Sequence, residues 1–248
     1  MSSDIEARPS LETFIARGLI TEVLGPVKSG KEATVFCCRA GPSTGVSHLA
    51  AKVYRPGARR SFKNDAVYQD GYWGWQQNTR ATRAFKNKSA FGREVQQGVW
   101  IHREWATLER LHAAGVAVPR PIACADDAIL MEFCGEDGVA APPLHAVRLD
   151  AAAARDLLDL LLWNVERMLG LHVVHGDLSP YNILCAPPCV HVIDFPQAVD
   201  PRFNQSAFRL LARDVESVVG HCVRYGARAD AGAIAASLWR RFLDGAIG

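Results

Sequence analysis

Five short apolar runs mark the first half of the chain. They predict β-strands at 19–27, 33–39, 49–54, 121–124 and 128–133. The polar residues 28–32 separate the first two runs, which predicts a hairpin with a tight turn. Between the third and fourth runs, Trp105, Leu108 and Leu111 recur at helical spacing and predict an amphipathic helix over 95–113. The first half is therefore expected to be a small sheet with one helix.

The second half of the chain has a different pattern. Glycines and prolines between 135 and 143 indicate a connector. Asp150 is then a suitable N-cap for a long helix from 151 to about 169, and Gly170 is expected to close that helix as its C′ residue. The other predicted elements are strands at 172–174, 183–185 and 190–193 and helices at 206–224 and 230–243.

These elements predict an α+β fold of two lobes. We expect an N-terminal extension at 1–18, a β-rich N-lobe at 19–134 and a mainly helical C-lobe at 135–248. Ligands tend to bind in clefts between lobes, so a two-lobed chain of this kind is expected to bind one there.

The composition indicates in which cellular compartment the protein is expected. The 248 residues are 49% hydrophobic and 22% charged, which is ordinary for a soluble globular protein. The longest apolar stretch, 157–171, carries Asp159, Glu166 and Arg167, so no segment is expected to cross a bilayer. The early residues show no secretory signal, and the odd number of seven cysteines favours reduced thiols. A cytoplasmic protein without a membrane partner is expected.

The net charge of +2 hides one strongly basic segment. Residues 55–93 carry nine lysines and arginines against two aspartates, a net of +7 that leaves −5 for the remainder. Seven aromatic residues are interleaved with these cations. That combination suits RNA or a ribonucleoprotein, because cations bind phosphates and rings stack on bases. It equally suits a solvated loop whose rings anchor it to the core.

The strongest chemical signal is H-G-D-L-S-P-Y-N at 175–182, followed by V-I-D-F at 192–195. Phosphoryl transfer needs a carboxylate at the attacking hydroxyl and oxygen ligands for Mg²⁺ on the phosphates. Asp177 and Asn182 lie five residues apart on one loop, and Asp194 follows a short apolar strand. This order of residues is typical of the kinase superfamily.

Such a protein also needs a lysine for the nucleotide phosphates. Lys52 lies in the apolar run A-A-K-V-Y, where a lysine is costly to bury unless it is paired. Glu104, in the middle of the predicted helix, is the first candidate partner, and Glu109, on a different face, is the second. The turn 28–33 is expected to cover phosphates with Ser29 and backbone N–H groups.

In a series of short motifs the sequence resembles the RIO family of atypical protein kinases. In chain order these are S-G-K-E-A-T-V-F at 29–36, A-K-V-Y at 51–54, M-E-F at 131–133, G-E-D-G at 135–138, H-G-D-L-S-P-Y-N at 175–182 and I-D-F-P-Q at 193–197. The first and the last are specific to that family, whereas H-G-D-x-x-x-x-N is shared with small-molecule kinases. The resemblance covers about residues 20–225. It implies a kinase-like fold with a truncated C-lobe, in a minimal member of bacterial type.

The resemblance implies roles for individual residues. Lys52 would bind the ATP phosphates and pair with Glu104. Asp177 would be the catalytic aspartate, and Asn182 and Asp194 would bind Mg²⁺ or Mn²⁺. The other implied ATP contacts are Ser29, Gly30 and Lys31 at the phosphates, Met131 as gatekeeper, and the backbone of Glu132 and Cys134 at the adenine.

These motifs predict an ATP- and Mg²⁺-dependent protein serine/threonine kinase that autophosphorylates, an ATPase, or both. The resemblance implies a phospho-aspartate at Asp194 in some members and serine autophosphorylation in the basic segment, for which Ser61 and Ser89 are candidates. Two alternatives are open. One is a small-molecule phosphotransferase of the aminoglycoside or choline kinase kind. The other is an ATP-gated module that docks the segment 55–93 onto RNA or ribonucleoprotein with slow turnover.

Overall fold

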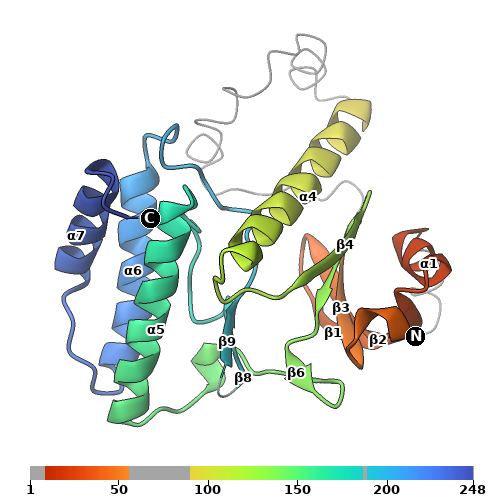
Figure 1. Cartoon of the computed structure of the whole chain (residues 1–248), viewed down its shortest axis with the longest axis horizontal. Helices are drawn as coiled ribbons and strands as arrows, with labels where there is room; N and C mark the ends of the chain where they lie inside the picture. Colours follow the sequence, from red (N-terminus) through yellow and green to blue (C-terminus); the bar gives the residue numbers. More distant parts are fainter. Residues whose placement is uncertain (1–8, 56–89, 187–188, 248) are drawn as a thin grey trace. The chain divides into compact units, whose positions relative to one another are not determined.

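The computed structural model divides into two compact units (Figure 1). The residues that it describes are 9–55, 90–186 and 189–247, with the backbone alone described at 90–97. Unit 1 holds the described parts of 1–61, 78–109 and 119–140, and unit 2 holds those of 110–118 and 141–248. The basic segment 55–93 therefore lies almost wholly outside the described residues, as do Ser61 and Ser89.

Unit 1 is built on a five-stranded antiparallel sheet with the strand order β1-β2-β3-β5-β4. The strands are β1 (Ile20–Ser29), β2 (Ala33–Ala40), β3 (His48–Tyr54), β4 (Pro121–Ala125) and β5 (Ala128–Glu132), and a small hairpin follows as β6 (Gly135–Glu136) and β7 (Val139–Ala140). The helices are α1 (Pro9–Ala16), the 3-10 turn η1 (Pro42–Thr44) and α4 (Ala90–Ala113), whose end passes into unit 2. All five predicted strands of the first half are present, and their ends differ by a few residues from the prediction.

The two faces of this sheet have different partners because side chains alternate along each strand. On one face, Leu49, Ala51 and Val53 of β3 pack with Leu11 and Phe14 of α1. On the other face, Tyr54 of β3 and Ile129 of β5 pack with Ile101 of α4, together with Ala33, Trp105, Cys124 and Met131. The sheet is thus covered by a helix on each face.

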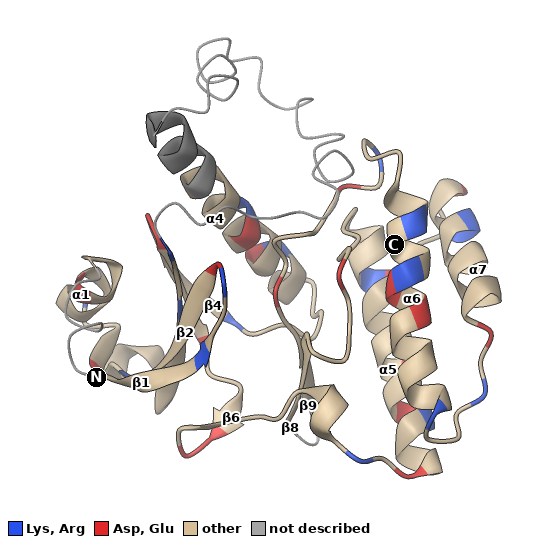
Figure 2. Ribbon diagram, turned by 180° about the vertical axis from the view of Figure 1, so that it is seen from behind, with Lys and Arg blue, Asp and Glu red and all other residues tan. Residues whose placement is uncertain are grey.

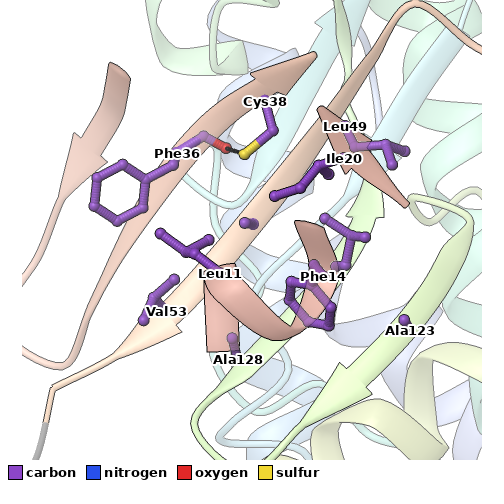
Figure 3. Packing of buried hydrophobic residues seen from close by; sticks show 11 residues of the cluster. Leu11, Phe14, Ile20, Phe36, Cys38, Leu49, Val53, Ala123 and Ala128 are labelled. Atoms are coloured by element: carbon purple, nitrogen blue, oxygen red, sulfur yellow. Dashed lines mark hydrogen bonds between the residues drawn. The ribbon is translucent and has the colours of Figure 1, made fainter. Parts of the chain in front are cut away.

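Helix α1 is a finding that sequence reasoning did not make, since residues 1–18 were expected only as an extension. Figure 3 shows Leu11 and Phe14 beside Val53, Ala128 and Ile20. Leu11 and Phe14 are 2% and 0% exposed, and each buried side chain of this size stabilises the fold by roughly 1.5–3 kcal/mol. The Ser10 hydroxyl also donates to the Asp127 carboxylate. Helix α1 therefore belongs to the core of unit 1.

Unit 2 is mainly helical. Its elements are the 3-10 turn η3 (Leu144–Ala146), α5 (Ala151–Gly170), the hairpin β8 (Ile183–Ala186) and β9 (Cys189–Val192), α6 (Ala207–Val223) and α7 (Ala231–Leu243). Charges of both signs lie along α5 and α6, whereas α7 carries only two arginines, in its last turn (Figure 2). Asn164 of α5 anchors the segment after α4, because its Oδ1 accepts from the Ala117 N–H at 2.7 Å. Within the described parts of the chain, no helix is long and apolar enough to cross a bilayer.

Helix α5 begins as predicted and ends differently. The Asp150 side chain accepts from the N–H groups of Ala152 and Ala153, which confirms it as the N-cap. The prediction for Gly170 is wrong: it is the last helical residue, and His172 takes the left-handed conformation with φ 57°. A Cβ at Gly170 would lie 3.0 Å from Ile247 Cγ2, so the glycine serves close packing of the C-terminus instead.

The strand predicted at 172–174 is also absent. Val174 makes one isolated bridge, to Val199, with reciprocal backbone hydrogen bonds of 2.9 and 3.0 Å. The left-handed residue His172 turns the chain sharply after α5, so the short apolar run leads directly into the loop that starts at His175. A buried apolar run of three residues does not distinguish a strand from a packed loop.

Acid pH is expected to destabilise unit 2 through His221. Its side chain is 2% exposed, and burial, followed by the charges of Arg224 and His145, lowers the pKa of its imidazole below 6.5. The unfolded chain then binds a proton before the folded one does, so stability is full above about pH 7 and falls as the pH drops below the unfolded pKa. Thermal unfolding between about pH 7.5 and about pH 5 should show a larger drop in Tm for wild type than for His221→Gln. Equal drops would contradict this assignment.

Candidate active site

Alternation along β3 places Lys52 on the same face of the sheet as α4. Leu49, Ala51 and Val53 face α1, so Lys52 and Tyr54 point to the opposite side. Lys52 Nζ lies 2.6 Å from Glu104 Oε1, and the two side chains are 12% and 2% exposed. The structure thus brings together the lysine and the first candidate partner. Glu109, the second candidate, is exposed.

The Glu104 carboxylate is held at both oxygens. Its Oε1 accepts from Lys52, and its Oε2 accepts from the Tyr54 hydroxyl at 2.5 Å. Tyr54 is 3% exposed, and its ring lies 5.3 Å from Lys52 Nζ. Burial is tolerable for these charges because the carboxylate is paired and hydrogen-bonded at once. Sequence reasoning missed Tyr54, although its spacing of two from Lys52 on a strand placed both on one face.

Breaking this pair is expected to impair nucleotide binding and the stability of unit 1. Removing one partner leaves a charge poorly solvated, which costs about 3–5 kcal/mol for a fully buried pair and less here, since Lys52 is partly exposed. Glu104→Gln should therefore lower the Tm and weaken binding of a fluorescent ATP analogue by about tenfold or more. Glu109→Gln, on the same helix, is the matched control and should leave both unchanged. Similar losses in the two variants would contradict the assignment.

The turn between β1 and β2 holds Ser29, Gly30 and Lys31. The Gly30 N–H donates to the Ala33 carbonyl at 2.9 Å, which closes the turn. Ser29, Gly30 and Lys31 are all exposed. The Ser29 hydroxyl lies 3.4 Å from Thr34 Oγ1 and accepts from Arg55 Nη2 at 2.7 Å. An exposed turn with a serine, a glycine and cations is chemically suited to bind an anion.

Beyond Lys52, the same face of the sheet carries a small apolar cluster. Cys37, Ala50 and Phe133 are buried there, with Val35, Met131 and Ala140 packed against them. Met131 of β5 thus lies within the cluster, and Glu132 and Cys134 follow it in the chain. The Glu132 N–H donates to the Arg120 carbonyl at 2.8 Å. Burial and the charge of Glu132 raise the pKa of the Cys134 thiol to about 12, so it stays protonated.

In unit 2, Asp177 and Asn182 share one loop. Asn182 Nδ2 donates to the Asp177 carbonyl at 3.0 Å and lies 3.4 Å from its Oδ2, and the Asn182 N–H donates to the Ser179 carbonyl at 2.8 Å. Asp177 is exposed. Partial desolvation raises the pKa of its carboxyl, the nearby charge of Asp194 adds to this effect and Arg213 opposes it.

A buried aspartate accepts hydrogen bonds from the backbone of this loop. Asp214 of α6 is 2% exposed, and it accepts from the Gly176 N–H at 2.7 Å and from the Leu178 N–H at 2.9 Å. Burial raises the pKa of Asp214, while the two N–H groups counteract this effect. The Arg213 guanidinium donates to the Gly176 carbonyl. Asp214 therefore ties the loop backbone to α6, and Arg213 adds a second contact to the same loop.

Asp194 follows β9 in an unusual backbone conformation. Its φ is 72°, a left-handed value that costs energy for a residue other than glycine. Ile193 connects it to the loop 175–182: its N–H donates to the Asn182 carbonyl at 2.9 Å, and its carbonyl lies 3.1 Å from His175 Nε2. Because Nε2 serves this carbonyl, His175 Nδ1 is left to accept the Asp177 N–H at 3.3 Å. His175 therefore holds the loop through both ring nitrogens.

The fold and these two sets of residues define a kinase-like protein. Unit 1 carries a lysine–glutamate pair and an exposed turn of Ser29, Gly30 and Lys31, and unit 2 carries Asp177, Asn182 and Asp194 on two loops that are tied together. Two structures of Rio2 kinase from Chaetomium thermophilum are similar to this chain, with TM-scores of 0.64 and 0.61 at 22% and 23% identity. Each similarity covers 92% of this chain, and 64% and 66% of those chains.

Sequence comparisons identify the family within this class. A family model described as the RIO domain matches residues 34–231. The RIO-type serine/threonine-protein kinase Rio1 of Haloferax volcanii is 32% identical over 219 residues, which is 88% of this chain and 69% of that protein. Human serine/threonine-protein kinase RIO1 is 30% identical over 90% of this chain, which spans 37% of the human protein. The chain belongs to the RIO family.

Proposed function

We propose that this chain is an ATP- and Mg²⁺-dependent protein serine/threonine kinase of the RIO type, which phosphorylates itself, hydrolyses ATP, or both. The observation that carries the proposal is the loop pair of unit 2, where Asp177, Asn182 and Asp194 are held by Asp214 and Ile193. Membership of the RIO family supports a protein kinase over a small-molecule phosphotransferase. In this proposal, unit 1 binds ATP and unit 2 transfers its γ-phosphate.

In unit 1, the proposed ATP contacts are of two kinds: exposed polar groups for the phosphates and an apolar cluster for the adenine. Lys52, oriented by Glu104, would bind the α- and β-phosphates, and Ser29, Gly30 and Lys31 would bind phosphate from the turn. The cluster around Met131 is apolar and suits a flat adenine ring. The Glu132 N–H is already bonded to Arg120, so its carbonyl would serve the adenine, together with the backbone of Cys134.

In unit 2, the donor atoms suit Mg²⁺. Asn182 uses its Nδ2 towards Asp177, which leaves the Oδ1 oxygen as a ligand, and Asp194 supplies a carboxylate. Mg²⁺ prefers such oxygens and takes its other ligands from phosphates and water, and so does Mn²⁺. When bound, the metal neutralises charge on the transferred phosphoryl group. Asp177 would accept the proton of the attacking serine or threonine hydroxyl while the γ-phosphate leaves ADP.

An aspartyl phosphate is a second proposed outcome of the same chemistry. One of the similar structures is titled a Rio2 kinase–ADP/Mg²⁺–phosphoaspartate complex. In this chain the Asp194 carboxylate would attack the γ-phosphorus of ATP, forming the O–P bond as the bond to ADP breaks. Water would then hydrolyse the acyl phosphate, returning Asp194 and releasing inorganic phosphate. The sum of the two steps is ATP hydrolysis.

A phosphosite map after incubation with MgATP labelled at the γ-phosphate tests these proposals together. Acid-stable label on serine or threonine, including Ser61 or Ser89, supports autophosphorylation. Label that is lost in acid or hydroxylamine, with phosphate release, supports the aspartyl phosphate at Asp194. A protein that binds MgATP but neither becomes labelled nor releases phosphate would contradict the proposed enzyme.

The basic segment 55–93 supports a second role, docking onto RNA or ribonucleoprotein under control of ATP. Its net charge of +7 and interleaved aromatic residues carry this proposal. Binding of a single-stranded RNA should then weaken steeply as salt rises, with a slope that changes when MgATP is present. Affinity that is independent of salt and nucleotide would contradict it.

A further inference from the structure

Arg55 directly follows β3 and contacts the turn between β1 and β2 through two groups. Its backbone N–H donates to the Glu32 carbonyl at 2.8 Å, and its Nη2 donates to Ser29 Oγ at 2.7 Å. Exposed arginines usually lose much rotamer freedom when they make one contact. Here the backbone hydrogen bond to Glu32 holds the Arg55 Cα close to the turn, so fewer side-chain rotamers need to be lost when the guanidinium binds the Ser29 hydroxyl. Arg55 thereby connects the turn to the strand that carries Lys52.

The direction of this hydrogen bond matters for what Ser29 can do. A guanidinium only donates, so the Ser29 oxygen is the acceptor and its own proton is directed elsewhere. The Thr34 hydroxyl is within reach, but its separation of 3.4 Å from the Ser29 oxygen makes it a weak partner. A hydroxyl that accepts from a cation is polarised and becomes a stronger donor. A phosphate oxygen is a better acceptor than a threonine hydroxyl. A bound phosphate would therefore accept the hydrogen bond that the Ser29 hydroxyl donates.

We propose that Arg55 is a positioning residue for the nucleotide phosphates and that it acts through the Ser29 hydroxyl. This inference rests on the proposed function, since it requires MgATP to bind at this turn. Lys28 and Lys31 are also exposed beside Ser29 and add positive charge. Arg55 differs from them because its guanidinium is bonded to the hydroxyl itself. The contribution of Arg55 therefore depends on Ser29 and on a ligand that carries phosphates.

Binding of MgATP and of adenosine, measured by isothermal titration calorimetry, tests this on four proteins: wild type, Arg55→Gln, Ser29→Ala and the double variant. Arg55→Gln should weaken MgATP by about tenfold, the size of one charge-assisted hydrogen bond near the surface, and leave adenosine within about twofold. In the Ser29→Ala background, the same substitution should add no more than about twofold. Arg55→Lys should give an intermediate loss of MgATP affinity, because lysine keeps the positive charge but lacks the planar guanidinium group.

The matched control is Arg39→Gln on the same hairpin. Arg39 is exposed and pairs with Glu22 at 3.1 Å, away from the turn, so MgATP affinity should not change. Unchanged MgATP affinity in Arg55→Gln, an equal loss for adenosine, or fully multiplicative effects with Ser29→Ala would each overturn the inference. Wild type that binds adenosine and MgATP equally weakly would overturn the proposed function as well, and this result is distinct from the other three.

Discussion

Asp194→Asn is expected to reduce γ-phosphate transfer from MgATP by roughly a thousandfold, because it removes the charge of the carboxylate that we propose as a Mg²⁺ ligand. The choice of asparagine follows from the backbone. Asp194 has a φ of 72°, and asparagine tolerates this left-handed conformation better than alanine does. The loss should therefore appear without a change in fold. Transfer is measured as protein label plus released phosphate, at saturating MgATP.

Asp137→Asn is the matched control for this variant. Asp137 is a second exposed aspartate in the left-handed region, with φ 50°, at the tip of the β6–β7 hairpin of unit 1. The same change of charge there should leave transfer unchanged. If Asp194→Asn kept wild-type transfer while folding normally, Asp194 would not be the metal-binding residue. Acid-labile label that persisted in this variant would likewise exclude Asp194 as the site of an aspartyl phosphate.

Asp214→Ala is expected to combine a loss of stability with a loss of transfer. The substitution leaves the N–H groups of Gly176 and Leu178 buried without an acceptor, which costs about 1–3 kcal/mol for each. Together the two losses lower the stability of unit 2 by about 2–4 kcal/mol, since some relaxation follows. Loosening of the loop also misplaces Asp177. Transfer should fall by about a hundredfold or more, since small displacements of a reacting group have effects of this size.

Hydrogen exchange at the two amides separates this role from general unfolding. The Gly176 and Leu178 amides should be protected in wild type and exchange much faster in Asp214→Ala. Asp150→Ala removes an aspartate that also accepts two backbone N–H groups, but at the exposed start of α5. It should cost about 1 kcal/mol and leave both the exchange of the loop and the transfer unchanged. Unaltered exchange in Asp214→Ala would contradict the proposed support of the loop.

Short-range patterns predicted much of the fold and the site. The apolar run 49–54 placed Lys52 correctly on a strand, and the helical spacing of Trp105, Leu108 and Leu111 identified α4 and with it Glu104. The spacing of Asp177 and Asn182 placed both side chains on one loop, because residues only five positions apart can belong to the same tight turn. These features depend on neighbours in sequence, and so sequence reasoning reached them.

Features that depend on long-range contacts were missed. The hydrogen bonds of Tyr54 with Glu104 of helix α4 and of Arg55 with Ser29 join residues that are 50 and 26 positions apart in the sequence. Helix α1 was missed because eight residues with two buried apolar side chains give a weak periodic signal, and its stability comes from packing on the sheet. The error at Gly170 has a similar cause. A glycine near a helix end predicts a C′ residue unless a distant segment, here Ile247, needs the space.

The most direct test of this account compares wild type and Asp177→Asn for transfer of the γ-phosphate of MgATP, to the protein itself or to water, under conditions where both are saturated with nucleotide. Asparagine keeps the shape of the loop but cannot accept a proton from the attacking hydroxyl. We predict transfer by wild type, a rate lower by at least about a hundredfold in Asp177→Asn, and MgATP affinities within about threefold of each other. Equal rates in the two proteins, or no transfer by a wild-type protein saturated with MgATP, would contradict the central claim.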